Sequence, residues 1–152
     1  MQQKITTLPV IPEDQNGSGI PATRREYYDE YGNLTWKMDE RGFLTRMAYD
    51  IPTGALTQRI DDVDTAQVSD SPSGWTTPAD GGRHVITDFT HDSQGRNIKT
   101  LRPEHEIDIG GTATMIRQVS WTVYKDDIFQ TWKAQGYTTV SGSSSRDRKS
   151  VV

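Results

Sequence analysis

A short motif that ends in glycine returns along this chain at a spacing of ten to eleven residues. Residues 28–32 read YDEYG, residues 39–42 read DERG, residues 49–54 read YDIPTG and, after a gap, residues 91–95 read HDSQG. A fixed period indicates that the chain contains copies of one small structural unit. Ten residues are too few for a pair of helices, but they suffice for one turn and one strand of about 5–6 residues. The spacing therefore predicts an all-β fold, an array of antiparallel strands joined by turns and irregular loops.

Each copy of the motif carries the residue types that a tight turn needs. The side chain of the aspartate can accept a hydrogen bond from the backbone two residues further on, and glycine adopts a positive φ without steric cost. We therefore expect φ > 0 at Gly32, Gly42 and Gly95. The copy that begins at Tyr49 has one extra residue, which predicts a bulge or a wider loop. The expected turn residues are Tyr28, Asp29, Gly32, Asp39, Gly42, Tyr49, Asp50, Gly54, Asp92 and Gly95.

Between the turns, apolar residues alternate with polar ones. Leu34, Trp36 and Met38 fall on one face of a short run, and Thr35 and Lys37 fall on the other. Alternation with a period of two is typical of a strand that is buried on one face only. No segment shows convincing helical periodicity. Similar alternation occurs at residues 43–49, 56–60, 85–89 and 115–123.

The pattern Y-D-x-x-G-x-L-x-x-x-x-D-x-x-G over residues 28–42 resembles the tyrosine–aspartate repeat of Rhs proteins, which also occurs in teneurins and insecticidal toxin-complex subunits. Residues 91–96 resemble a further copy, with His91 in the tyrosine position. The resemblance implies a β-sheet that spirals into a hollow shell around a C-terminal toxin or unfolded cargo. The implied partners are the remaining repeats and the cargo of a parent chain, and no chemistry and no cofactor are implied for the repeat. The matching segments are residues 26–61 and 86–101, with a looser match at 112–137.

The composition suits a sheet with one solvated face, a partly disordered chain or both better than a thick globular core. Only 32% of the residues are hydrophobic, whereas about 45–50% is usual for a soluble domain. The 17 lysines and arginines are interspersed with 21 acidic residues, so the sequence offers no basic patch for nucleic acid. Cysteine is absent, which excludes disulfides and cysteine-based metal sites. No run approaches the ~20 apolar residues of a membrane span.

Proline, glycine and polar tracts divide the chain into segments. We expect residues 102–111 to be a connection and residues 125–127 to form a hairpin turn. We expect the lead-in, the inserted loop (with Trp75 as its anchor) and the tail to be poorly ordered. The segments are an irregular lead-in at 1–22, regular repeats at 23–61, an inserted loop at 62–83, further hairpins at 84–137 and a disordered tail at 138–152.

The two ends of the chain lead to expectations about the parent protein. Residues 147–152 also match the translation of a common sequencing adapter, and we favour this artefact over a natural polar tail. The first residues are too polar for a signal peptide. We expect the parent protein to be secreted or displayed at the cell surface, with its targeting signal outside this segment.

No arrangement of residues points to an enzyme. The sequence has no G-x-S-x-G, no H-E-x-x-H and no phosphate-binding loop. A structural role is expected for His91, and a solvated position for His105 between two glutamates. The acidic group 61–64, with Asp70, lacks the spacing of a calcium loop and is expected to be a solvated acidic loop. We predict no catalytic residue, no metal ligand and no cofactor.

Three tryptophans are the candidate ligand-stacking residues. We expect Trp36, Trp121 and Trp132 to be buried on a sheet face, in keeping with a non-catalytic structural segment. If all three were exposed in a row, they would instead favour a carbohydrate- or receptor-binding module that contacts cell-surface glycans.

Overall fold

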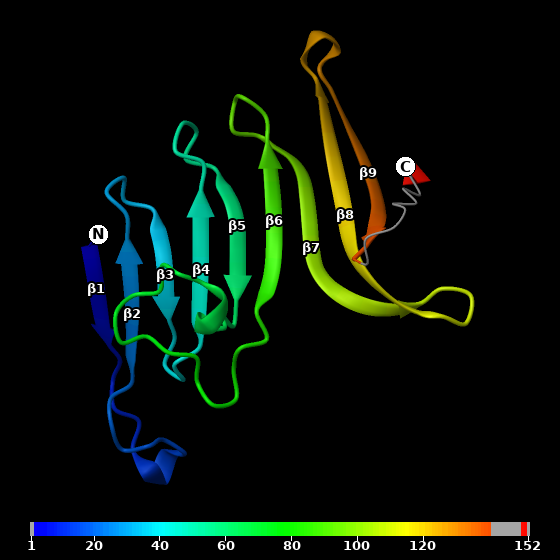
Figure 1. Ribbon diagram of the computed structural model, residues 1–152. Coiled ribbons are helices and arrows are strands. Elements are labelled where there is room, and N and C mark those ends of the chain that lie inside the picture. Colours follow the sequence, from blue (N-terminus) through cyan, green and yellow to red (C-terminus); the bar gives the residue numbers. More distant parts are fainter. Residues whose placement is uncertain (1, 141–149, 152) are drawn as a thin grey trace. The chain divides into compact units, whose positions relative to one another are not determined.

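The computed structural model describes residues 2–140 and 150–151. It confirms the expected fold class: the chain forms an antiparallel open sheet in which neighbouring strands follow chain order (Figure 1). Helical structure in the described residues is limited to short 3-10 turns of three residues each. The chain divides into two compact units, which we describe separately. The first comprises residues up to Ala48 together with Ile60–His84, and the second comprises Tyr49–Arg59 together with the residues from Val85 onward.

The first unit is a small antiparallel sheet covered on one face by a long loop. Cross-strand neighbours include Lys4 with Glu26 and Tyr27 with Trp36. The loop, residues 62–84, crosses the strands in Figure 1 and contains the 3-10 turn η2 (Thr65–Gln67). The strands are β1 (Gln2–Thr7), β2 (Thr23–Tyr28), β3 (Leu34–Met38), most of β4 (Leu44–Tyr49) and the end of β5 (Leu56–Asp61), and a 3-10 turn, η1 (Glu13–Gln15), lies between β1 and β2.

The core of the first unit lies between this loop and the sheet. Trp75 from the loop packs edge-on against Tyr27 and Trp36, with ring centroids 5.3 Å and 6.3 Å apart respectively. Trp36 and Trp75 are buried, as are Leu44 and Ile60 of the strands and Val63 of the loop. The sequence predicts a poorly ordered insertion here. The loop instead supplies the second layer of the core, because Val63 and Trp75 have an apolar sheet face to cover.

The second unit consists of long strands and hairpins. Strands β8 and β9 form a regular hairpin whose register runs from Ile116 opposite Thr139 to Lys125 opposite Gln130. The expected hairpin turn after Lys125 is present as η3 (Asp126–Ile128). The strands are the first part of β5, then β6 (Val85–His91), β7 (Asn97–Asp108), β8 (Ala113–Lys125), β9 (Gln130–Thr139) and β10 (Ser150–Val151).

Two segments expected to be irregular contain strands. Residues 2–7, assigned to the lead-in, form β1, because their backbone pairs with β2 in full register before the first proline. Residues 102–108, assigned to a connection, continue β7. The register of β7 against β8 shifts between Leu101 and Glu104, a bulge that accommodates Pro103.

The side chain of Arg117 explains how β7 tolerates this bulge. Its guanidinium donates hydrogen bonds to the carbonyl oxygens of Arg102 (2.8 Å) and Leu101 (3.2 Å) at the irregular step. It also forms an ion pair with Asp88 of β6 at 2.8 Å and is only 15% exposed. Backbone acceptors next to the bulge are thereby satisfied by a side chain, as buried polar groups require.

The burial of β8 and the end of β9 also differ from expectation. The alternation at residues 115–123 predicts that Met115, Val119 and Val123 share one face of β8 and that Ile116 lies on the other. Val119 is buried, but Met115 and Val123 are 41% and 46% exposed, and Ile116 is buried as well. The expected disordered tail contains the end of β9 at Thr139 and strand β10. Residues 141–149 and 152, with most of the adapter-like segment, lie outside the described residues.

Candidate functional site

The repeated aspartate turn is the feature that the sequence and the structure share most clearly. In the first unit, Asp29 directly follows β2, and its Oδ1 accepts hydrogen bonds from the backbone N–H groups of Tyr31 (2.9 Å) and Asn33 (2.8 Å). The backbone N–H of Asp29 donates to the carbonyl oxygen of Asn33 at 3.0 Å. The carboxylate thus holds both sides of the reversal between β2 and β3.

The same arrangement occurs at the next turn and again in the second unit. Oδ1 of Asp39 accepts from the N–H groups of Arg41 and Phe43, each at 2.9 Å. Oδ1 of Asp92 accepts from Gln94 and Arg96, again at 2.9 Å each. Three separate turns therefore have one hydrogen-bond geometry. We call these three the aspartate turns.

The glycine of each aspartate turn has the expected backbone conformation. The φ angles are 86° at Gly32, 86° at Gly42 and 76° at Gly95, so the prediction of positive φ is confirmed. A Cβ at Gly32 or Gly42 would meet no atom within 4 Å. The requirement for glycine there is consequently conformational and not a matter of space.

The motif at residues 49–54 forms the wider loop that its extra residue predicts. The N–H of Gly54 (φ 67°) reaches the carbonyl oxygen of Asp50 at 2.8 Å, and the N–H of Asp50 donates to Ala55, one residue beyond the position used in the aspartate turns. The Asp50 carboxylate bonds the hydroxyl and the N–H of Thr53 at 2.6 Å and 3.2 Å.

The tyrosine position of the motif has a less uniform environment. The hydroxyl of half-buried Tyr28 donates to a carboxylate oxygen of Glu26 at 3.0 Å, which raises the pKa of Tyr28. At the corresponding position of the third aspartate turn, Nδ1 of His91 is buried without a hydrogen-bond partner among the described residues.

Hydrogen bonding in the turns favours the ionised carboxylates. Burial acts to raise the pKa of Asp29, but the side chain of Asn33 and the backbone N–H groups outweigh it and lower that pKa. Burial is likewise outweighed at Asp92, whose pKa is lowered chiefly by Arg96. Carboxylates committed in this way to the backbone are acceptors within the fold and are poorly suited to act as general acids or bases near neutral pH.

Arg96 links the third aspartate turn to the β8–β9 hairpin. Its guanidinium contacts Asp92 at 2.7 Å and Asp126 at 2.7 Å and 3.0 Å. It also lies over the ring of Tyr124, 4.3 Å from the centroid. The hydrogen bonds that Arg96 donates to the carboxylates of Asp126 and Asp92 raise the pKa of Arg96, and the bond to Asp126 lowers the pKa of that carboxyl. The glycine–arginine step of the motif therefore anchors a neighbouring hairpin.

The carboxylates of the acidic loop form hydrogen bonds and an ion pair with other groups of the first unit. Asp62 accepts the N–H groups of Gly82 (2.8 Å) and Arg83 (3.1 Å). Asp64 caps η2, and Asp70 forms an ion pair with Arg46 at 2.8 Å. Within the described residues, no group of three His, Cys, Asp or Glu side chains is arranged to hold a metal ion.

A cavity of about 550 Å³ lies beside the second aspartate turn. Arg41, Arg83 and Asp80 line it, and none of these side chains forms an ion pair with another described residue. Phe43 and Leu44 provide the apolar part of the wall. The mixture of charged and apolar side chains suits a small polar ligand.

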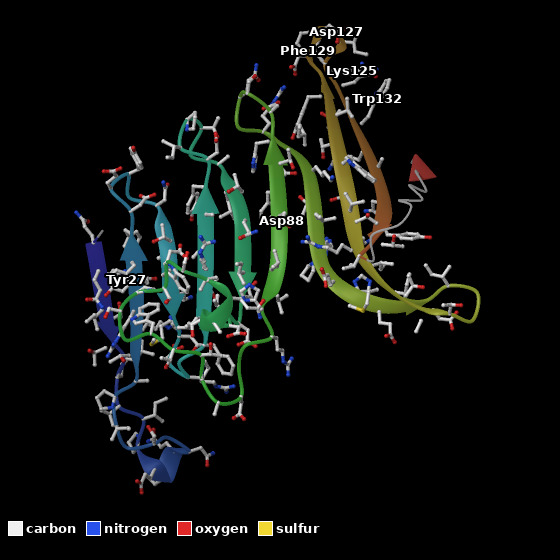
Figure 2. The ribbon with its side chains drawn as sticks, in the orientation of Figure 1. Tyr27, Asp88, Lys125, Asp127, Phe129 and Trp132 are labelled. Carbon is white, nitrogen blue, oxygen red and sulfur yellow. The ribbon has the colours of Figure 1, made fainter. Side chains whose placement is uncertain are left out.

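The three candidate stacking residues differ in burial. Trp36 is 1% exposed, in agreement with the expectation of burial, and Trp121 is half-buried. Trp132 is 53% exposed, so the expectation that it would be buried is wrong. It lies on β9 near the hairpin turn (Figure 2). The three tryptophans therefore form neither a common core nor an exposed row.

The histidines occupy three different settings. Nδ1 of His84 accepts the N–H of Asp64 at 3.1 Å and so helps to close the base of the loop. His105 is exposed, as expected, and its Nδ1 lies 3.3 Å from the carbonyl oxygen of Pro103. His91 and Asp92 are adjacent, and Asp92 is engaged by Arg96.

Sequence reasoning missed the exposed end of the β8–β9 hairpin. Phe129 is 97% exposed and has a φ of 54°. The available signal was an apolar pair, Ile128 and Phe129, directly after two aspartates at a predicted turn.

No known family model matches the chain, and no curated protein sequence is significantly similar to it. In the described residues, no helix is long and apolar enough to cross a membrane.

Proposed function

We propose that this chain is a non-catalytic structural segment of a larger Rhs-type repeat protein, in which its strands form part of a β-wall around a toxin or effector domain. The observation that carries the proposal is the aspartate turn, which recurs with the same hydrogen bonds at Asp29, Asp39 and Asp92. An array of one strand and one turn, repeated in chain order, is a means of extending a sheet.

The hydrogen bonds and backbone conformations of the motif residues support a structural role. The carboxylates of the three aspartate turns accept backbone N–H groups, and the glycines serve a backbone conformation. Residues that are repeated for chemistry would be expected to converge on a cavity. Of these three turns, only the one at Asp39 borders the described cavity.

The proposal is tested in the parent protein. Reading the coding DNA beyond residue 152 should reveal further tyrosine–aspartate repeats followed by a distinct C-terminal domain. In the expressed parent, limited proteolysis should spare that domain, and Trp75→Ala, which opens the core of the first unit, should make it cleavable. Trp132→Ala is the matched control and should leave protection unchanged. A C-terminal domain cleaved as fast in the parent as when it is expressed alone would contradict the proposal.

A second candidate is a carbohydrate- or receptor-binding module, which the exposure of Trp132 favours. Its ring is 53% exposed, and Nζ of Lys125 lies 5.3 Å from the ring centroid. Exposed tryptophans can stack on apolar faces of ligands. A glycan array with the intact chain and with Trp132→Ala separates the two functions: binding that is lost with the indole would support the module, and an empty array would remove it.

A further inference from the structure

The end of the β8–β9 hairpin exposes four apolar side chains that nothing else in the described residues covers. Ile128 is 50% exposed, Phe129 97%, Trp132 53% and Val123 46%. We call this set the hairpin tip. Val123 and Trp132 are direct cross-strand partners and therefore share one face of the hairpin. Figure 2 shows Phe129 at the apex, with Trp132 further down the same end of the hairpin.

Folding alone does not account for phenylalanine at position 129. Its φ of 54° lies in the left-handed region, where glycine is favoured and bulky residues are uncommon. The conformation closes the hairpin, since the N–H of Phe129 reaches the carbonyl oxygen of Asp126. Glycine would close the turn equally well, and the ring itself is almost fully in water. An apolar side chain kept in a strained and exposed position indicates an environment other than water.

The opposite face of the hairpin holds the tip in place. Arg96 bridges Asp92 and Asp126 and stacks on Tyr124, whose hydroxyl donates to the carbonyl oxygen of Asn97 at 3.3 Å. These contacts tie the base of the tip to the third aspartate turn within the same unit. The apolar side chains are therefore presented from an anchored hairpin.

We propose that the hairpin tip inserts into the interfacial region of a zwitterionic phospholipid bilayer. A few apolar side chains at the end of a hairpin can insert among lipid headgroups without the broad contact of ~800 Å² per partner that a stable protein interface usually has. Trp132 suits the interface, because its ring is apolar, its Nε1–H donates to Gln130 at 3.1 Å and Lys125 lies over its face.

The charges around the tip select the kind of lipid. Lys125 and Arg96 balance Asp126 and Asp127, so the tip has no net charge to attract an anionic surface. Asp127 is exposed and forms no ion pair with a described residue, and it would be repelled by anionic headgroups. Binding should therefore depend on apolar insertion and be insensitive to salt. This inference is independent of the proposed function.

The experiment is flotation of the full chain with phosphatidylcholine vesicles. The wild-type chain should float with the vesicles, and Phe129→Gly should bind about tenfold or more weakly, since one buried aromatic side chain contributes at least that factor. Phe129→Gly also suits the left-handed backbone, so its thermal transition should not fall. Ile128→Ser, which keeps Phe129, should weaken binding as well. The matched control is Ile51→Ser, because Ile51 is 73% exposed at another turn of the same unit.

Two further readings distinguish insertion from other kinds of association. Brominated phosphatidylcholine should quench tryptophan fluorescence in the wild-type chain, and Trp132→Phe should remove most of that quenching. The proposal is overturned if the wild-type chain does not float, or if binding requires phosphatidylserine and is lost in salt. It is also overturned if Phe129→Gly binds as tightly as the wild-type chain, or if Ile51→Ser, which should bind like the wild-type chain, weakens binding as much as Phe129→Gly. Self-association without lipid that Phe129→Gly abolishes would also overturn it, because the tip would then bind a second copy of the chain.

Discussion

In the first unit, the loop 62–84 covers one face of the strands, whereas the long strands of the second unit leave several apolar side chains in water. The buried hydrophobic residues of the first unit are Trp36, Leu44, Ile60, Val63 and Trp75, whereas those in the described part of the second unit are Ile116 and Val119. Both units nevertheless contain the same aspartate turn. The turn therefore sets strand direction and spacing, and a separate segment must supply the cover that makes a core.

The largest expected effect concerns this cover. Trp75→Ala removes a buried ring that contacts Tyr27 and Trp36, and it should destabilise the first unit by about 3–5 kcal/mol. Trp132→Ala in the second unit should change stability little, because that ring is half exposed. Urea unfolding of both variants measures the difference. Equal losses would show that the loop is not the main source of stability in the first unit.

The second unit should depend more on polar contacts. Arg117→Ala removes a largely buried guanidinium that satisfies Asp88 and carbonyl oxygens at the β7 bulge. Hydrogen bonds to charged groups contribute about 1.5–3 kcal/mol each, and a loss of about 2–3 kcal/mol is expected overall. Denaturant midpoints provide the measurement, with exposed Arg102→Ala as the control. A loss of stability no larger than that of Arg102→Ala would contradict the role of Arg117 at the bulge.

The turns could be predicted from the sequence, whereas the predictions that failed depend on contacts between residues that are distant in sequence. The aspartate turns at Asp29, Asp39 and Asp92 were predictable because their geometry depends only on residues within four positions. Burial at Trp132 was not, because period-two alternation places a side chain on a face but does not say whether another element covers that face. The continuation of β7 past Pro103 depends on Arg117, sixteen residues from Leu101 in sequence.

Substitution of the turn glycines should affect both units in the same way. Gly42→Val and Gly95→Val each place a β-branched residue at positive φ and should cost more than ~1 kcal/mol. Thermal unfolding of the two variants gives the comparison. A neutral result at Gly42, where a Cβ has free space, would indicate that the backbone relaxes and that the turn does not require glycine.

Acid should weaken the turns by a smaller amount, and salt should distinguish the units. The pKa values of Asp29, Asp92 and Asp126 are lowered in the folded chain, so below the unfolded value of about 3.9 the unfolded state binds more protons. The stabilisation is present above that pH and is lost as the pH falls through the folded values. Salt should reduce this effect at Asp92 and Asp126, which face Arg96, more than at Asp29.

The corresponding measurement is the urea midpoint at pH 6 and pH 3, at low and high salt. Asp92→Asn removes one titrating group and should show a smaller loss in acid than the wild-type chain. A wild-type midpoint that is unchanged between the two pH values would contradict the role of the ionised carboxylates.

The central claim is that the aspartate turn is one backbone device used in both units. Amide hydrogen exchange tests it most directly at the backbone N–H groups that donate to the aspartate carboxylates. These are the N–H groups of Arg41 and Phe43 in the first unit and of Gln94 and Arg96 in the second. The account predicts protection at both turns, with Asp39→Ala releasing only the first pair and Asp92→Ala only the second. Fast exchange at either turn in the wild-type chain, or protection that survives loss of its own aspartate, would contradict it.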